Sequence, residues 1–182
     1  MTVKHIIKVP NPFLRKKAMP VEKITDEIKK LLNDMLETMY HANGIGLAAT
    51  QIEENKRLIV MDCGKNHDNM SKNEKHLPNP IKMINPELIF KSKEIKEREE
   101  GCLSIPGYQA NVKRPNFVKV SYFDENNNKK ELKAEGLLSA CVQHEIDHLN
   151  GILFIDYLSK LKKDMIIKKL IKHKKDLEKV IL

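Results

Sequence analysis

The chain of 182 residues is 41% hydrophobic and carries a formal net charge of +8, nearly all of it from lysine. This length and composition fit one folded domain over residues 1–182 and exclude a disordered chain, and no run of about 18 apolar residues predicts a membrane-spanning helix. The first ten residues lack the apolar core of a signal peptide, so we expect a cytoplasmic protein with no membrane contact.

The first third of the chain predicts a helix followed by a buried strand. Apolar residues recur at i, i+3, i+4 and i+7 through 24–39, which is typical of an amphipathic helix. Thr25 is a suitable N-cap, and the Asn-Gly pair at 43–44 is a suitable end of the helix. The apolar segment within 57–62 predicts a buried strand, and the polar segment 64–80 predicts a surface loop.

The middle of the chain predicts further strands. Residues 82–90 form one strand region, interrupted by Pro86, and a short extended segment is expected at 99–105. Residues 117–123 alternate between apolar and polar side chains. A polar turn joins them to a partner strand at 129–133, which predicts a hairpin.

Two more helices are expected after this hairpin. Residues 137–149 have helical spacing with Gly151 as the end, and 160–180 form a long lysine-rich helix. Strands cluster in the middle and helices lie at the ends and after the hairpin. This order predicts an α+β fold with mostly antiparallel sheets packed around the central helix, with further helices at the N- and C-terminal ends.

The central helix contains the pattern His-Glu-x-x-His. His144 and His148 lie one helical turn apart on the same side, so both imidazoles can bind one divalent metal ion. Glu145 is rotated by about 100° from His144, and from there it can take a proton from a water at the metal. The alternative is two histidines on a purely structural helix. The apolar neighbours disfavour a solvated pair, because they would bury the helix.

Three ligands from the protein and one open position are typical of a catalytic metal site. Cys141 lies seven residues before His148, about 10.5 Å along a helix axis, so Cys141 cannot easily share their metal and is predicted to pack in the core. Cys63 ends an apolar strand and also fits a core position. Cys102 remains, beside Gly101, on a segment that can reach the site from another element.

Three segments together resemble peptide deformylase. They are Gly-Ile-Gly-Leu-Ala-Ala-Thr-Gln at 44–51, Glu-Gly-Cys-Leu-Ser at 100–104, and Gln-His-Glu-Ile-Asp-His-Leu-Asn-Gly at 143–151. They occur in the order of that family with similar spacing, and the opening segment 6–18 also looks like the family's N-terminus. The resemblance implies hydrolysis of the N-formyl group of the initiator methionine on nascent polypeptides, with release of formate.

The resemblance also implies a role for each motif residue. Glu145 would be the general base, while the side-chain amide of Gln51 and the backbone N–H of Leu103 would donate to the formyl oxygen. Such donors stabilise an oxyanion that develops during attack on the formamide. The implied metal ligands are Cys102, His144 and His148. The expected ion is Fe²⁺, with Zn²⁺, Ni²⁺ or Co²⁺ as alternatives, because the ligand chemistry suits several of these metals.

Further residues are candidates for contact with the substrate. The resemblance and the position next to the ligands suggest a methionine pocket formed by Ile45, Leu137, Ala140 and Cys141. Gly46 belongs to a small-residue stretch that lets a substrate backbone lie alongside as an added strand. The same stretch also fits a helix stop followed by a tight edge strand, and both can hold at once. Glu100 is a candidate for the substrate site and for an ion pair with Arg114 that braces the Cys102 segment.

The expected partners are formyl-methionyl nascent peptides and, through the lysine-rich helix 160–180, the ribosome. The charge has the correct sign for phosphate, but a solvated helix face would have the same composition. Two other functions share part of the pattern. One is a general metallopeptidase with a third ligand after the second histidine, for which Asp156 is available. The other is a basic RNA-binding protein with a structural metal site.

Overall fold

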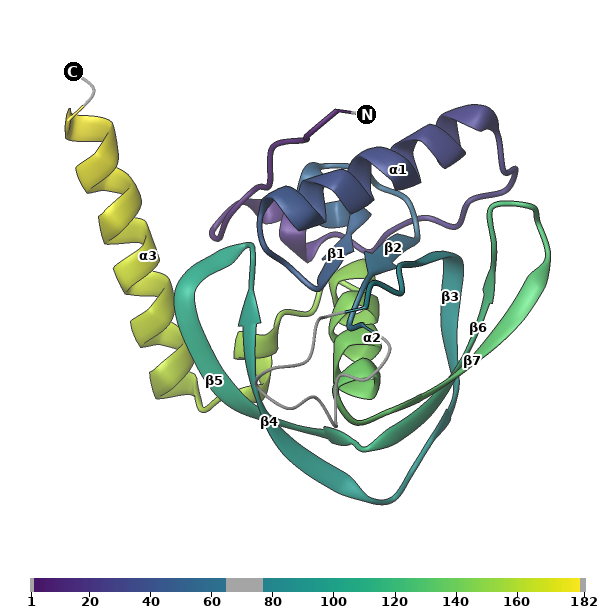
Figure 1. Cartoon of the computed structure of the whole chain (residues 1–182). Coiled ribbons are helices and arrows are strands. Elements are labelled where there is room, and N and C mark those ends of the chain that lie inside the picture. Colours follow the sequence, from purple (N-terminus) through teal and green to yellow (C-terminus); the bar gives the residue numbers. More distant parts are fainter. Residues whose placement is uncertain (1, 65–76, 181–182) are drawn as a thin grey trace.

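The structure is a computed structural model that describes residues 2–64 and 77–180, with side chains described as far as residue 172. Residues 65–76 of the predicted surface loop lie outside this range. The elements are, in chain order, η1 (Pro12–Arg15), α1 (Asp26–His41), β1 (Gly46–Ala48), η2 (Ala49–Ile52), β2 (Leu58–Met61), β3 (Ile81–Lys91), β4 (Ile95–Cys102), β5 (Ile105–Pro115), β6 (Phe117–Phe123), β7 (Lys129–Glu135), α2 (Gly136–Leu149), η3 (Phe154–Tyr157) and α3 (Lys160–Val180) (Figure 1).

The strands form two antiparallel sheets. A five-stranded sheet has the order β1-β2-β3-β6-β7, and β4 pairs with β5 in a separate two-stranded sheet. The helix α2 lies between the two sheets and contacts strands of both, while α1 covers β1 and β2 (Figure 1). The predicted α+β fold, with antiparallel sheets around a central helix, is confirmed.

The first predicted helix is confirmed as α1. The Thr25 hydroxyl accepts a hydrogen bond from the backbone N–H of Ile28, which is the N-cap interaction expected from the sequence. The apolar face of α1, including Leu32 and Met35, packs against Leu58 and Val60 of β2. This packing fixes the position of the chain at the end of α1, from which β1 begins.

The predicted hairpin is β6–β7, which pairs in register from Phe117 opposite Glu135 to Phe123 opposite Lys129. Its inner face buries Val118 and Val120 against α2. Pro86 does not end β3, but the pairing of β3 with β6 shifts register between Ile84 and Glu87. Asn85 has a positive φ of 52° at this irregularity, so the strand accommodates Pro86 and continues beyond it.

The β4–β5 hairpin was only partly predicted. The expected extended segment at 99–105 is wrong in extent, because β4 and β5 span 95–115 and the chain turns at Leu103 and Ser104. Most side chains of β4 are exposed, so the strand lacks the alternation of apolar residues that would reveal it.

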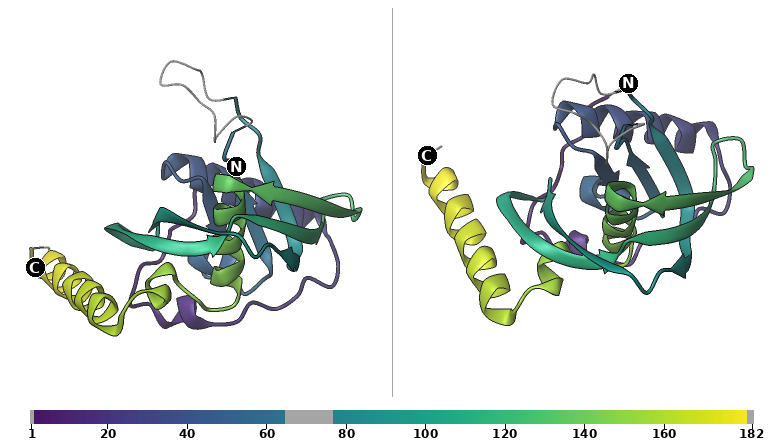
Figure 2. Two further views of the ribbon diagram at one scale, coloured as in Figure 1. Left: turned by 90° about the horizontal axis from the view of Figure 1, so that it is seen from below. Right: turned by 60° about the horizontal axis from the view of Figure 1, so that its bottom comes forward.

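The C-terminal part of the chain follows the prediction closely. α2 begins at Gly136, one residue before the predicted start, and α3 begins at Lys160. α3 extends from one side of the protein (Figure 2), and Ile166 and Leu170 anchor it in a cluster with Ile7 and Val9 of the N-terminal segment. None of the helices in the described part of the chain combines the length and hydropathy that crossing a bilayer requires.

Candidate active site

Three potential metal ligands meet at the middle of the molecule. His144 and His148 lie one turn apart on α2 with ring centroids 5.0 Å apart, and Cys102 reaches them from the end of β4. The Sγ atom of Cys102 lies 3.1 Å from Nε2 of His148. One donor atom from each of the three residues lies within 4.8 Å of the other two. The set expected from the sequence is therefore brought together.

The donor set fits a divalent metal ion. Donors about 2.0–2.3 Å from a tetrahedral metal are about 3.3–3.7 Å apart, which is compatible with the spacing here. Nδ1 of His144 lies 2.9 Å from Oε2 of Glu100, so a neutral His144 that donates this proton keeps the Nε2 lone pair for a metal. Burial lowers the pKa of His148 well below its usual value, which keeps its ring neutral.

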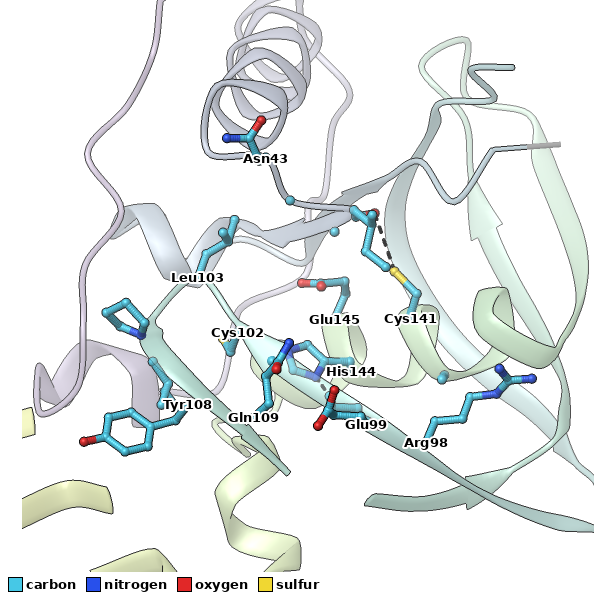
Figure 3. Close-up of a pocket in the computed structure, with 18 of the residues that line it drawn as sticks. Asn43, Arg98, Glu99, Cys102, Leu103, Tyr108, Gln109, Cys141, His144 and Glu145 are labelled. Atoms are coloured by element: carbon cyan, nitrogen blue, oxygen red, sulfur yellow. Dashed lines mark hydrogen bonds and ion pairs between the residues drawn. The ribbon is translucent and has the colours of Figure 1, made fainter. Parts of the chain in front are cut away.

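Glu145 lies beside the potential ligand His144 and is almost fully buried (Figure 3). Burial raises the pKa of its carboxyl group to about 7. Its Oε2 atom is buried without a hydrogen-bond partner among the described residues. A buried carboxylate with one unpartnered oxygen can receive a proton from a reacting group in the cleft.

Gln51 lies on η2, the short helix that follows β1. Its Oε1 accepts a hydrogen bond from the backbone N–H of Ala48 at 2.8 Å, which fixes the orientation of the amide. Its Nε2 then faces the turn after β4, with Ser104 Oγ at 3.1 Å and Cys102 Sγ at 3.6 Å. Gln51 therefore presents its donor beside Cys102, one of the three potential metal ligands.

Gln51 and Glu145 border a cavity of about 650 Å³ (Figure 3). Of the residues expected from the sequence to contact the substrate or the reacting atoms, all line it: Ile45, Gly46, Gln51, Glu100, Leu103, Leu137, Ala140, Cys141 and Glu145. Cys102 and His144 also border the cavity. Sequence reasoning missed Asn43, Arg98, Glu99, Tyr108 and Gln109 as cavity residues. The last four reach the cavity because β4 pairs with β5, whereas Asn43 lies between α1 and β1.

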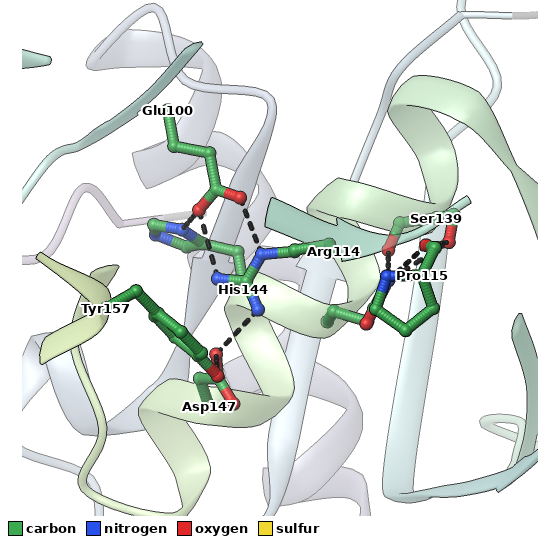
Figure 4. Close-up of polar contacts among 8 residues, drawn as sticks. Glu100, Arg114, Pro115, Ser139, His144, Asp147 and Tyr157 are labelled. Atoms are coloured by element: carbon green, nitrogen blue, oxygen red, sulfur yellow. Dashed lines mark hydrogen bonds and ion pairs between the residues drawn. The ribbon is translucent and has the colours of Figure 1, made fainter. Parts of the chain in front are cut away.

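An ion-pair network supports His144, one of the three potential ligands, from behind (Figure 4). The predicted pair between Glu100 and Arg114 is confirmed, with Arg114 Nε 2.5 Å and Nη2 3.0 Å from the two carboxylate oxygens. Burial raises the pKa of Glu100, but hydrogen bonds from His144 and Arg114 outweigh it and hold the pKa below its usual value. Asp147 and Tyr157 complete the network and were not expected from the sequence.

The alternative third ligand, Asp156, lies in a different environment. Its carboxylate binds Arg15, Lys163 and the backbone N–H of Leu153. Within the described part of the chain, it does not belong to the group of residues that could hold a metal, whereas Cys102 does. The arrangement therefore differs from that of a metallopeptidase whose third ligand follows the helix.

Comparison with known proteins gives consistent results. Residues 3–164 match the sequence profile of the family described as polypeptide deformylase. The chain is 51% identical over 172 residues to a peptide deformylase of Rhizobium meliloti, covering 94% of each chain. It is 52% identical over 174 residues to a peptide deformylase of Pelagibacter ubique, covering 96% of each.

Solved structures show the same similarity. The crystal structure of a peptide deformylase from Ehrlichia chaffeensis is 41% identical, with a TM-score of 0.88 over 96% of this chain and 98% of that chain. A second structure of a peptide deformylase from that organism, in complex with actinonin, has a TM-score of 0.87 and is 42% identical, over 95% and 98% of the respective chains.

Proposed function

The chain belongs to the peptide deformylase family, and from that premise we propose how its own residues carry out the reaction. It is a metal-dependent hydrolase that removes the N-formyl group from the initiator methionine of nascent polypeptides and releases formate. The observation that best supports the residue roles is that Glu145, Gln51 and the three donor side chains border or adjoin one cavity.

The proposed metal ligands are Cys102, His144 and His148. A divalent metal at such a set lowers the pKa of a water and polarises a carbonyl oxygen. We propose Fe²⁺ as the native ion on the basis of the family, since one cysteine and two histidines suit iron and zinc alike.

Glu145 is the proposed general base. It takes a proton from the attacking water at Oε2, for which the described residues provide no hydrogen-bond partner, and delivers it to the amine of the methionine as the C–N bond breaks. Burial supports this exchange, because a carboxyl pKa near 7 lets Glu145 both accept and return a proton at neutral pH.

The oxyanion that forms on the formamide needs donors that are already in place. Gln51 Nε2 and the backbone N–H of Leu103 are the proposed donors. Ala48 holds the Gln51 amide in this orientation, so the donor does not need to reorganise during the reaction.

The substrate is proposed to bind along β1 with its methionine side chain in the cavity. β1 is an edge strand of the five-stranded sheet, so a peptide can add to it by backbone hydrogen bonds. Ile45, Leu137, Ala140 and Cys141 then form the apolar wall around the methionine. Gly46 leaves space for the substrate backbone, and Glu100 acts mainly by holding His144.

This function is tested with protein purified without oxygen. Its metal content is measured, and hydrolysis of a formyl-Met peptide is compared with hydrolysis of the acetylated peptide and of internal peptide bonds. We expect bound iron and formyl-selective hydrolysis that Glu145→Ala abolishes. Cleavage of internal bonds would favour a metallopeptidase instead, and RNA binding without hydrolysis would favour a binding protein.

We propose in addition that residues 1–182 form a single catalytic domain in the cytoplasm and that α3 contacts the ribosome. Among the residues of α3 whose side chains the structure describes, five lysines are exposed, and a phosphate contact needs only a positive charge within reach. These lysines are Lys160, Lys162, Lys168, Lys169 and Lys172.

The ribosome contact is tested by replacing these five lysines with glutamine. Deletion of α3 is a poorer test because Ile166 and Leu170 contribute to the core. We expect the variant to lose co-sedimentation with ribosomes in low salt while keeping deformylase activity on a short peptide. Unchanged co-sedimentation would exclude the contact.

A further inference from the structure

A continuous series of polar contacts leads from His144 to the protein surface (Figure 4). His144 Nδ1 lies 2.9 Å from Glu100 Oε2, and Arg114 donates to both oxygens of Glu100. Arg114 Nη1 also donates to Asp147 Oδ2 at 2.8 Å. The hydroxyl of Tyr157 donates to that same oxygen at 2.8 Å.

Tyr157 contacts Arg114 as well as Asp147. Its ring lies against the guanidinium group, with Arg114 Cζ 4.8 Å from the ring centroid. The inner members of the series are buried, since Arg114 is 5% and Glu100 8% exposed, whereas Tyr157 is 50% exposed. Tyr157 therefore covers the outer end of a buried ion-pair network.

We propose that Tyr157 is a positioning residue of the metal centre. It holds Asp147 and the guanidinium of Arg114 in place, and Arg114 in turn keeps Glu100 against His144. This inference rests on the proposed function only in that His144 is a metal ligand.

The geometry of Arg114 explains why its outer contact matters. Nε and Nη2 bind Glu100 and Nη1 binds Asp147, so one planar group spans the two carboxylates. A planar guanidinium that loses its position at Asp147 must also change its angle to Glu100. The hydrogen bond that orients the His144 ring then changes with it.

The same short helix braces the His144 ring in a second way. Phe154, three residues before Tyr157 on η3, stacks on His144 with centroids 6.2 Å apart and an angle of 23° between the planes. In contrast, Nδ1 of His148 is buried without a hydrogen-bond partner in the described part of the chain. The carboxylate that supports a histidine ligand therefore contacts His144, and η3 lies behind the His144 ring.

The experiment measures metal retention as well as activity. Full-length protein is loaded with Co²⁺, and the rate of metal loss to an excess of chelator and the visible absorption spectrum are recorded. The variants are Tyr157→Phe, which removes the hydroxyl, and Tyr157→Leu, which also removes the ring. Tyr40→Phe is the matched control, because the Tyr40 hydroxyl also donates to a carboxylate, that of Asp62.

We expect Tyr157→Phe to lose Co²⁺ about 3–10-fold faster than the wild type, Tyr157→Leu to lose it faster still, and Tyr40→Phe to lose it at the wild-type rate. The absorption bands should shift in the Tyr157 variants alone. In an Asp147→Asn background, Tyr157→Phe should add little, because the oxygen through which it acts has already changed.

Three results would overturn the proposal. They are equal release rates for Tyr157→Phe and the wild type, a loss of thermal stability without faster release, and a full effect of Tyr157→Phe in the Asp147→Asn background. A wild-type protein that binds no Co²⁺ would instead contradict the metal site itself, so the two failures are distinguishable.

Discussion

The backbone of Gly46 lies directly against the side chain of Glu145. A Cβ atom at position 46 would lie 2.3 Å from Oε1 of Glu145 and 3.0 Å from Sγ of Cys141. β1 and α2 can therefore approach this closely only because residue 46 has no side chain. The same contact places the proposed peptide-binding edge of the sheet beside the proposed general base.

We expect Gly46→Ala to lower kcat/KM for a formyl-Met peptide by about 100-fold, because Glu145 must move by about 1 Å to avoid the new methyl group. Overpacking should also lower the free energy of unfolding by about 1–3 kcal/mol. Gly101→Ala is the control, since a Cβ there has its nearest neighbour at 3.4 Å. Activity of Gly46→Ala close to that of the control would contradict the prediction.

Gln51→Glu separates the two functions of the Gln51 amide. The carboxylate can still accept from Ala48, but the donor at Nε2 becomes an anionic oxygen near the developing oxyanion. We expect kcat to fall by about 100–1000-fold with a fold that remains intact by circular dichroism. A rise in KM at unchanged kcat would mean that Gln51 contributes only to ground-state binding.

Metal removal should affect stability as well as activity. A chelator is expected to abolish hydrolysis and to lower Tm, because a metal bound only to the folded state adds about 2.7 kcal/mol at 100 times its Kd. Cys102→Ser should remove most of the rise in Tm that added metal produces. Cys63→Ser is the control, since Cys63 is also a free cysteine but lies outside the donor set, and the metal-dependent rise in Tm of this variant should persist.

The sequence predicts those parts of the site that repeat with helical spacing or form a short motif. The pattern around His144 and His148 places both histidines on one face, because a helix fixes the direction of residues four positions apart. The same helical geometry also favours Cys102 over Cys141 as the predicted third ligand, because Cys141 lies too far from His148 along the helix axis. The burial of Val118 and Val120 also follows from simple alternation along a strand.

The parts that escaped prediction depend on pairing between segments with little periodic signal. β4 is rich in charged residues, and its pairing with β5 brings Tyr108 and Gln109 to the cavity. Tyr157 contacts Arg114 only because η3 packs against β5, the strand that carries Arg114. Such contacts arise from tertiary packing, which local propensity does not encode.

Asp156 is expected to stabilise the junction between the N-terminal segment and α3. Burial raises its pKa, but hydrogen bonds from Arg15, Lys163 and the backbone of Leu153 outweigh this and hold the pKa below its usual value. A carboxyl group with a lowered pKa in the folded state stabilises the protein above its unfolded-state pKa of about 3.9, and this stabilisation is lost as the pH falls through the folded-state pKa.

We therefore expect Asp156→Asn to lower the free energy of unfolding by about 1 kcal/mol at pH 7, a modest effect because Arg15 is 39% and Lys163 34% exposed. The difference from the wild type should shrink as the pH falls below about 4, because the carboxyl group then takes up a proton in the unfolded state and, at still lower pH, in the folded state as well. Urea unfolding at pH 7 and pH 3 measures both values. Glu94→Gln, which removes one exposed partner of Lys96, is the control and should change stability little at either pH. A deficit of Asp156→Asn that is equal at both pH values would show that the ion pairs do not cause it.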